Sequence, residues 1–163
     1  MALPGRRGAL AAILVLAVAV PLTLVAGAGS PVGSHMAVVK GRSMEPILHT
    51  GDIVFLKHPP PDGIRVGDVV VYTRGGGFVI HRVVKVYRHG SATCYVVWGD
   101  NRKTNPIPDP GDPLSCGTTT LRVGGYAYTA SGIPYSRIVG VVVSVHGSLL
   151  KIPYLGGFSL LFR

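Results

Sequence analysis

The chain has 163 residues, enough for one domain of ordinary size together with one membrane segment. Hydrophobic residues make up 47% of it and the mean hydropathy is +0.42, values that are high for a wholly soluble protein. Sixteen Lys and Arg oppose 7 Asp and Glu, and the resulting charge of +9 suits anionic lipid or nucleic acid. The basic residues are scattered and no nucleic-acid-binding motif accompanies them, which argues against nucleic acid as a partner.

The N-terminal segment predicts a membrane anchor. Arg6 and Arg7 precede a run over residues 8–29 that carries no charge. A helix of this length spans a hydrocarbon core of about 30 Å. Because positively charged flanks stay cytoplasmic, we expect residues 1–7 inside the cell and the chain beyond the anchor outside, in a single-pass protein of the cell membrane.

A cleavable signal peptide is the alternative to a retained anchor. Residues 26–28 read Ala-Gly-Ala, which fits a signal-peptide cleavage site. The charge-free run is longer than the apolar region usual in such peptides, which favours the retained anchor. The predicted organisation is then a linker over residues 30–36 and an extracytoplasmic domain over residues 37–163.

Beyond the anchor the pattern changes to short runs rich in Val, Ile, Tyr and Thr, separated by glycine and proline. Such runs predict strands, and they cover residues 37–40, 52–57, 68–73, 78–87, 93–98, 120–129 and 137–146. No helical periodicity of useful length follows residue 30. We therefore predict a mainly β domain, a small antiparallel barrel or sandwich, whose apolar tail from Lys151 on lies at the membrane interface or completes the sheet.

The two cysteines, Cys94 and Cys116, both lie in the predicted extracytoplasmic domain. An oxidising compartment allows one disulfide between them. A metal site is not expected, because no second pair of Cys or His stands at ligand spacing. Nothing in the sequence predicts a cofactor.

Ser43 lies in the stretch Gly-Arg-Ser-Met-Glu-Pro, directly after the first predicted strand. A serine nucleophile needs a base, and a histidine base needs an acceptor that orients it. Among six histidines, only His81 lies in the middle of a predicted strand, where alternation puts it on one face with Val79 and Val83. Such a setting favours the neutral imidazole that a base requires. The alternative interpretation is non-catalytic: Ser43 would lie on an ordinary surface turn, and His81 would be a structural residue of the core.

Three of the seven acidic residues share one long loop after the strand predicted over residues 93–98. They are Asp100, Asp109 and Asp112. Long loops in compact domains tend to be functional or disordered. This loop is therefore the place to look for the acceptor that would orient the histidine.

Together these segments resemble the type I signal peptidases of the archaeal and endoplasmic-reticulum kind. The stretch GRSMEPILHTGDIVFLK is similar to that family's serine box, VIHRVVKV to its base box and WGDNRKTNPIPDP to its acid box. IVGVVVSV and IPYLG are similar to its closing segments, and the order matches over most of residues 37–157. Bacterial members carry lysine where this chain has His81, so the resemblance implies a serine–histidine mechanism.

Two departures from the family pattern concern the acid and the oxyanion hole. Asp100 and Asp109 are nine residues apart, farther than the two aspartates of the usual acid box. The surroundings of Asp109 match the family, which implies that Asp109 orients His81 while Asp100 has a supporting hydrogen-bonding role. Many members carry a serine two residues before the nucleophile, where this chain has Gly41. The oxyanion must then be held by the Ser43 N–H and a further donor that the sequence does not identify.

The resemblance implies a membrane-bound serine endopeptidase that removes signal peptides from secreted preproteins by cutting after small residues. Val39, Met44 and Ile80 are expected to line shallow pockets for those residues. The implied partners are preprotein signal peptides and the lipid bilayer. Whether the chain acts alone or with the secretion machinery does not follow from the sequence.

Two other functions fit parts of the sequence. The first is a serine–lysine protease like the related repressor autoproteases, with Lys85 or Lys40 as the base, although those repressors carry a DNA-binding domain that this chain lacks. The second is a membrane-anchored β domain that binds a partner and cleaves nothing. Loss of preprotein processing in a Ser43→Ala variant would argue against this second function.

Overall fold

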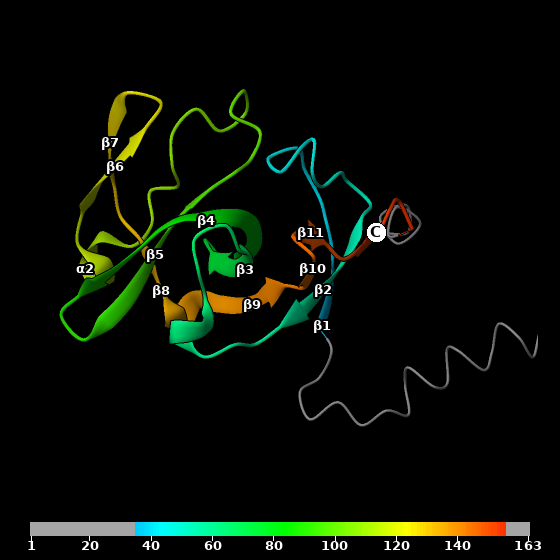
Figure 1. The fold of residues 1–163 in the computed structure, drawn as a ribbon, viewed down its shortest axis with the longest axis horizontal. Coiled ribbons are helices and arrows are strands. Elements are labelled where there is room, and N and C mark those ends of the chain that lie inside the picture. The colour runs from blue at the N-terminus through cyan, green and yellow to red at the C-terminus, as the bar shows by residue number, and fades with distance from the viewer. Residues whose placement is uncertain (1–34, 156–163) are drawn as a thin grey trace, which may run out of the picture. The chain divides into compact units, whose positions relative to one another are not determined.

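The computed structural model describes residues 35–155. The predicted anchor over residues 8–29 lies outside this range, so the anchor and the topology built on it stay predictions. Within the described range, every helix is too short to span a membrane. The described part is mainly β, as Figure 1 shows, which confirms the predicted fold class at this level.

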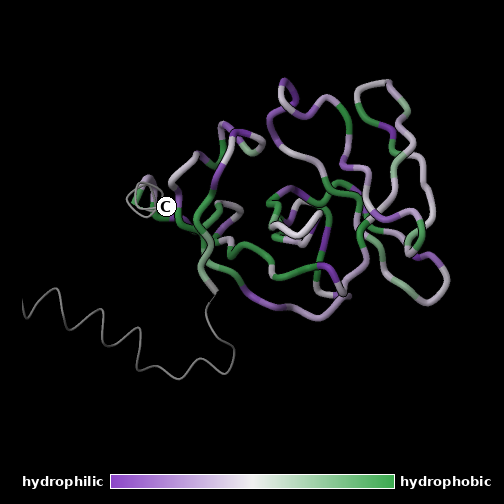
Figure 2. Tube along the Cα trace, turned by 180° about the vertical axis from the view of Figure 1, so that it is seen from behind, coloured by the Kyte–Doolittle hydropathy of each residue, from purple (hydrophilic) through white to green (hydrophobic). Residues whose placement is uncertain are grey.

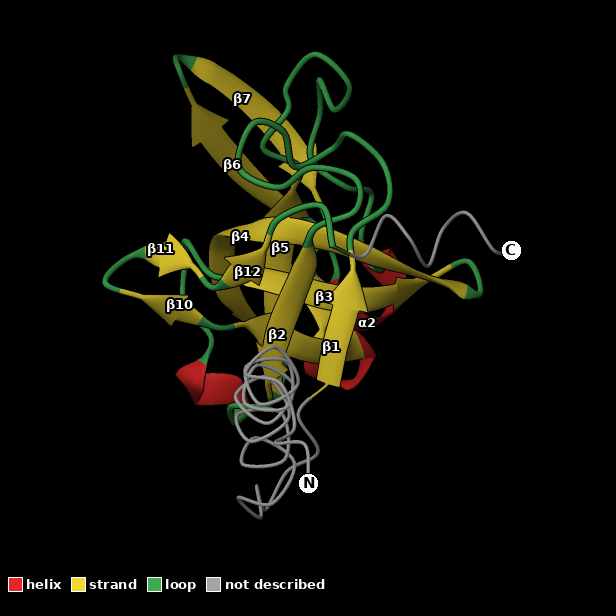
Figure 3. Ribbon diagram, turned by 90° about the vertical axis from the view of Figure 1, so that its right-hand side faces the viewer, coloured by secondary structure: helices red, strands yellow, loops and turns green. Residues whose placement is uncertain are grey.

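The main sheet has eight antiparallel strands in the order β1-β2-β9-β3-β4-β5-β8, and β12 pairs with β2 beside this path. Figure 3 shows β1 and β2 side by side at one end of the sheet. The hydrogen-bonded path does not close into a barrel among the described strands. The strands are β1 (His35–Val38), β2 (Ile53–Lys57), β3 (Val69–Arg74), β4 (Gly77–His89), β5 (Ala92–Trp98), β8 (Ile133–Pro134), β9 (Ile138–Val142) and β12 (Lys151–Ile152).

In the part of the chain that the structure describes, two small hairpins and three short helices accompany the sheet. The β6–β7 hairpin extends away from the main sheet in both Figure 1 and Figure 3. Its strands are β6 (Thr119–Val123) and β7 (Tyr126–Ala130), and the second hairpin pairs β10 (Ser144–Val145) with β11 (Ser148–Leu149). The helices are η1 (Pro61–Gly63), α2 (Pro113–Cys116) and η2 (Tyr135–Arg137).

Two of the predicted strands were too long, and glycine explains the break in one of them. The run over residues 120–129 was predicted as one strand, but it folds as the β6–β7 hairpin because Gly124 and Gly125 take φ of 58° and 82° in its turn. Positive φ of this kind is readily adopted by glycine and suits a two-residue hairpin turn. The run over residues 137–146 also divides, since β9 ends at Val142 and β10 belongs to another sheet.

Both faces of the central strands are buried. Alternation sends Val69 and Val71 of β3 into one cluster with Leu48 and Val54, while Val70 and Tyr72 pack on the other face. Figure 2 shows hydrophobic residues concentrated along the central strands. A third cluster, between β5 and the β6–β7 hairpin, contains Val96, Trp98, Leu121 and Ala130. Burial of this apolar area on both faces is the main stabilising contribution.

A disulfide and an additional short strand complete the domain. Cys94 of β5 and Cys116 of α2 form the disulfide that the sequence allowed, with their Cα atoms 5.8 Å apart. Lys151 and Ile152 pair with β2 as β12, so this part of the apolar tail completes the sheet. The disulfide holds the chain that follows the long loop against β5.

The β3–β4 hairpin determines what surrounds His81. Val70 lies opposite His81 and Tyr72 lies opposite Val79 in the antiparallel register. Directly paired residues project from the same face, so His81 shares a face with Val70, Tyr72 and Val79. The base predicted from β4 and a polar aromatic residue from β3 are thereby brought together.

Candidate active site

Ser43 lies on the turn between β1 and β2, and the loop after β5 holds the backbone of this turn. The backbone N–H of Asn101 donates to the Ser43 carbonyl at 2.9 Å, and the Asn101 side chain donates to the Arg42 carbonyl at 3.0 Å. A Cβ added to Gly99 would lie 2.6 Å from the Ser43 carbonyl oxygen. Only glycine permits that approach, so the Gly-Asp-Asn stretch of the long loop fixes the position of the serine turn.

Met44, the residue after the serine, anchors the turn in the core. Its side chain is 1% exposed and packs with Leu48 and Val54. The backbone N–H groups of Ile47 and Leu48 both donate to the Met44 carbonyl, at 3.0 and 2.9 Å. Met44 was expected to line a pocket for small substrate residues, but its buried side chain packs in the core cluster instead.

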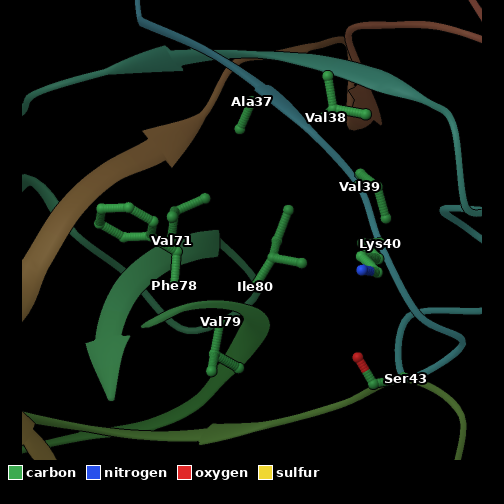
Figure 4. Close-up of a pocket in the computed structure, with 9 residues that line it drawn as sticks. All are labelled: Ala37, Val38, Val39, Lys40, Ser43, Val71, Phe78, Val79 and Ile80. Carbon is green, nitrogen blue, oxygen red and sulfur yellow. The ribbon is translucent and has the colours of Figure 1, made fainter. Parts of the chain in front are cut away.

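An apolar pocket of about 220 Å³ lies beside Ser43. Figure 4 shows it between the chain at residues 37–40 and the start of β4, with the Ser43 hydroxyl directed into it. Two of the expected pocket residues, Val39 and Ile80, line it, and Met44 does not. Its lining residues are Ala37, Val38, Val39, Lys40, Ser43, Val71, Phe78, Val79 and Ile80.

His81 is 3% exposed and carries its polar contacts on one ring nitrogen. Its Nδ1 lies 3.3 Å from Oδ2 of Asp109 and 3.2 Å from the hydroxyl of Tyr72. Burial, reinforced by the charge of Arg74, lowers the pKa of His81 to about 4. The imidazole is therefore neutral at physiological pH, and Nε2 is the nitrogen that can accept a proton from another group.

Asp109 is buried beside the histidine. Its Oδ2 accepts a hydrogen bond from the Tyr72 hydroxyl and lies 3.1 Å from Nη1 of Arg74. Its backbone N–H donates to the Val97 carbonyl at 3.0 Å, which fixes the loop here. Burial raises the pKa of Asp109 to about 6, so the carboxylate is ionised at neutral pH and becomes protonated just below it.

Asp100 has a different partner. Its two carboxylate oxygens accept hydrogen bonds from Nε and Nη2 of Arg82, at 2.9 and 2.7 Å. Arg82 also donates to the Gly67 carbonyl at 2.7 Å. This bidentate pair fastens the long loop to β4. The structure thus brings Asp109 to the histidine and leaves Asp100 as a support of the loop.

Within residues 35–155, no hydrogen bond joins the Ser43 hydroxyl to the His81 ring. Hydrogen bonds between catalytic groups are often long before substrate binds, so this separation is compatible with a nucleophile and its base. The two lysines weighed as alternative bases differ in position. Nζ of Lys85 donates to Oγ1 of Thr119 at 2.7 Å and to the Thr120 carbonyl at 2.8 Å, whereas the exposed Lys40 lines the pocket with Ser43.

Two charged or polar neighbours of His81, Tyr72 and Arg74, were missed by the sequence reasoning. Alternation along β4 identified only Val79 and Val83 as neighbours of the histidine. The glycine-rich turn between β3 and β4 was the available signal, because the hairpin register around it places Val70 opposite His81 and Tyr72 diagonally beside it. Arg74 lies at the end of the same strand.

Comparison with known proteins identifies relatives of this chain. A Peptidase S24-like family model matches residues 17–112. The signal peptidase complex catalytic subunit SEC11C of Homo sapiens is 36% identical over 151 residues, which cover 87% of this chain and 73% of SEC11C. The signal peptidase complex catalytic subunit sec11 of Schizosaccharomyces pombe is 31% identical, over 78% of this chain and 76% of its own length. This chain therefore belongs to the type I signal peptidase family, of the archaeal and endoplasmic-reticulum kind.

Proposed function

We propose that this signal peptidase is a serine endopeptidase in which Ser43 is the nucleophile, His81 the general base and Asp109 the acid that orients the base. The observation that carries these roles is the buried contact of 3.3 Å between Nδ1 of His81 and Oδ2 of Asp109. The loop that contributes Asp109 also holds the serine turn, through the hydrogen bond from Asn101 to the Ser43 carbonyl. A neutral imidazole with an ionised acceptor is the arrangement that a serine nucleophile needs.

The reaction follows from these roles. Ser43 Oγ attacks the carbonyl carbon of the scissile bond while Nε2 of His81 takes the hydroxyl proton. The imidazolium then gives that proton to the amine of the mature protein as the C–N bond breaks. Water, deprotonated by the same nitrogen, hydrolyses the acyl-enzyme, and Ser43 recovers its proton.

The oxyanion needs donors, and the Ser43 backbone N–H supplies one. Within the described residues this N–H has no hydrogen-bond partner, so it is available to a developing negative charge on the substrate. Gly41, which stands where many relatives carry serine, has φ of +101° and offers no side-chain hydroxyl. The second donor therefore comes from another group.

The pocket beside Ser43 supports a substrate with small side chains before the cut. Its walls are apolar apart from Lys40 and Ser43, and Val39 and Ile80 are among the residues that line it. An extended peptide between the chain at residues 37–40 and the start of β4 would place a small residue there (Figure 4). The proposed substrates are the signal peptides of secreted preproteins.

We also propose that residues 8–29 anchor the domain in the cell membrane, with residues 1–7 cytoplasmic and residues 37–163 outside. The charge-free run after Arg6 and Arg7 supports this topology. An anchor of this kind would hold the active site at the bilayer surface, where signal peptides emerge. That placement raises the effective concentration of substrate.

Cleavage of a purified preprotein in detergent tests the function. We expect the wild-type chain to release the mature protein and the Ser43→Ala variant to release none above background. Cleavage by the chain alone would also show that no other subunit is required. An active Ser43→Ala variant would contradict the assigned nucleophile and leave the non-catalytic binding domain as the better account.

Replacement of Arg74 by glutamine should move the acid limb of the kcat/KM profile to higher pH by about one unit. The change removes a cation 3.1 Å from Asp109, which raises the pKa of the carboxyl. It also removes a charge that lowers the pKa of His81. Both shifts act in one direction because the active form needs Asp109 ionised and His81 neutral.

The matched control for this prediction is Arg88→Gln. Arg88 is an exposed residue toward the far end of β4, and its replacement changes the net charge by the same amount. Activity at alkaline pH should survive in both variants. If the profiles of Arg74→Gln and Arg88→Gln coincide, Arg74 does not act on the pair.

A further inference from the structure

Three polar side chains converge on a single oxygen of Asp109. Oδ2 accepts from the Tyr72 hydroxyl, lies 3.1 Å from Nη1 of Arg74 and lies 3.3 Å from Nδ1 of His81. A carboxylate oxygen offers about two lone-pair sites. Of the three, only Tyr72 makes a hydrogen bond to this oxygen, whereas Arg74 and His81 lie within ion-pair distance of it.

The Tyr72 hydroxyl can accept the Nδ1–H of His81, for which Oδ2 of Asp109 has little free lone-pair capacity. A phenol has one proton to donate, and the proton of Tyr72 goes to Asp109. Its oxygen lies 3.2 Å from Nδ1 of His81 and keeps lone pairs that can accept the ring N–H. Tyr72 is 1% exposed, so bulk water is excluded from this hydroxyl.

The fold places this hydroxyl by two independent means. The ring packs in the cluster that contains Val70, Val83 and Val141. The register between β3 and β9 shifts between Val71 and Tyr72. Irregularities of this kind re-aim a side chain and occur often beside active sites. In an ordinary core tyrosine the hydroxyl often bonds only to a backbone carbonyl, whereas the Tyr72 hydroxyl contacts the side chains of His81 and Asp109.

We propose that Tyr72 is a positioning residue of the peptidase: its hydroxyl accepts the Nδ1–H of His81 and links the imidazole to Asp109. This inference rests on the proposed function of the site. The chain His81–Tyr72–Asp109 fixes the tautomer in which Nε2 is free to take the Ser43 proton. Hydrogen bonds in such a chain strengthen one another, so the imidazolium formed during the reaction is stabilised through the tyrosine.

The test is Tyr72→Phe, with Tyr95→Phe as its matched control. Tyr95 is also fully buried in the same cluster, but its hydroxyl donates to the Pro61 carbonyl at 2.6 Å. Both variants remove one buried hydroxyl. We expect Tyr72→Phe to lower kcat by about 10- to 100-fold with little change in KM, and Tyr95→Phe to keep the wild-type kcat.

Two further readouts separate positioning from a structural role. In the Asp109→Asn background, Tyr72→Phe should cost much less than in the wild type, since both residues act through one chain of hydrogen bonds. The Nδ1 proton resonance of His81 should shift in Tyr72→Phe and stay in place in Tyr95→Phe. The resonance reports on the hydrogen bond even without turnover.

The proposal is overturned by a Tyr72→Phe variant whose kcat equals that of Tyr95→Phe. It is also overturned if the losses from Tyr72→Phe and Asp109→Asn multiply, or if the His81 resonance does not move. Failure of the proposed function has a different signature, namely cleavage that persists in Ser43→Ala. The two failures are therefore distinguishable in one set of assays.

Discussion

Replacement of His81 by alanine should lower kcat by about 10²- to 10⁴-fold, because the variant has no group that can accept the Ser43 proton. The neutral, buried imidazole is the basis of this expectation, since burial holds the pKa of His81 at about 4. The rate of mature-protein release at saturating preprotein, in detergent, measures the effect. KM should change little, because His81 does not line the pocket beside Ser43.

Lys85→Ala and Lys40→Ala are the controls for this variant. The Lys85 ammonium is held by Thr119 and Thr120 of β6, and its loss should affect stability rather than turnover. Lys40 is exposed at the pocket, whereas a lysine base requires burial to keep it neutral. Both lysine variants should keep most activity. An active His81→Ala enzyme together with an inactive Lys40→Ala enzyme would identify Lys40 as the base.

Replacement of Asp109 by asparagine should lower kcat by about 10²- to 10⁴-fold while the domain stays folded. The asparagine amide can turn its NH₂ group toward the Tyr72 hydroxyl and Nδ1 of His81, which favours the tautomer of His81 that carries its proton on Nε2. That tautomer cannot accept a proton from Ser43. Turnover and thermal unfolding of the same preparation together separate lost chemistry from lost structure.

Asp100→Asn is the matched control, since it makes the same chemical change in the same loop. It weakens the bidentate contact with Arg82 and should loosen the loop that holds the serine turn. We expect a smaller loss of kcat and a lower melting temperature. If Asp109→Asn were near wild type and Asp100→Asn inactive, the roles of the two aspartates would be reversed.

The strand content could be predicted from the sequence because β-branched runs between glycine and proline are local signals. The boundaries of β2 through β5 lie within a few residues of the predicted runs. The pair Gly124 and Gly125 was also a local signal, for a hairpin turn, although the run that contains it was predicted as a single strand. The order of the strands in the sheet was not predictable, because β9 pairs with β2 and β3, which are far from it in the sequence.

The candidate site divides in the same way. Ser43 and His81 stand in motifs that can be read directly, and the family order pointed to Asp109. The roles of Tyr72 and Arg74 depend on cross-strand register and on burial around one carboxylate oxygen, which no single segment displays. Met44 was predicted to line the pocket because it follows the nucleophile in the sequence, but its side chain packs in the core.

The pH dependence of kcat/KM for the wild-type chain tests the serine–histidine–aspartate account most directly. Raising the pH through about 6 ionises Asp109, whose pKa is raised by burial, while His81 is already neutral above about 4. Because the two groups are in contact, the acid limb of the kcat/KM profile reports apparent pKa values of the pair. The account predicts a rate that rises through this acid range and is level by neutral pH. A rate that rises only above neutral pH would contradict it and indicate a lysine base.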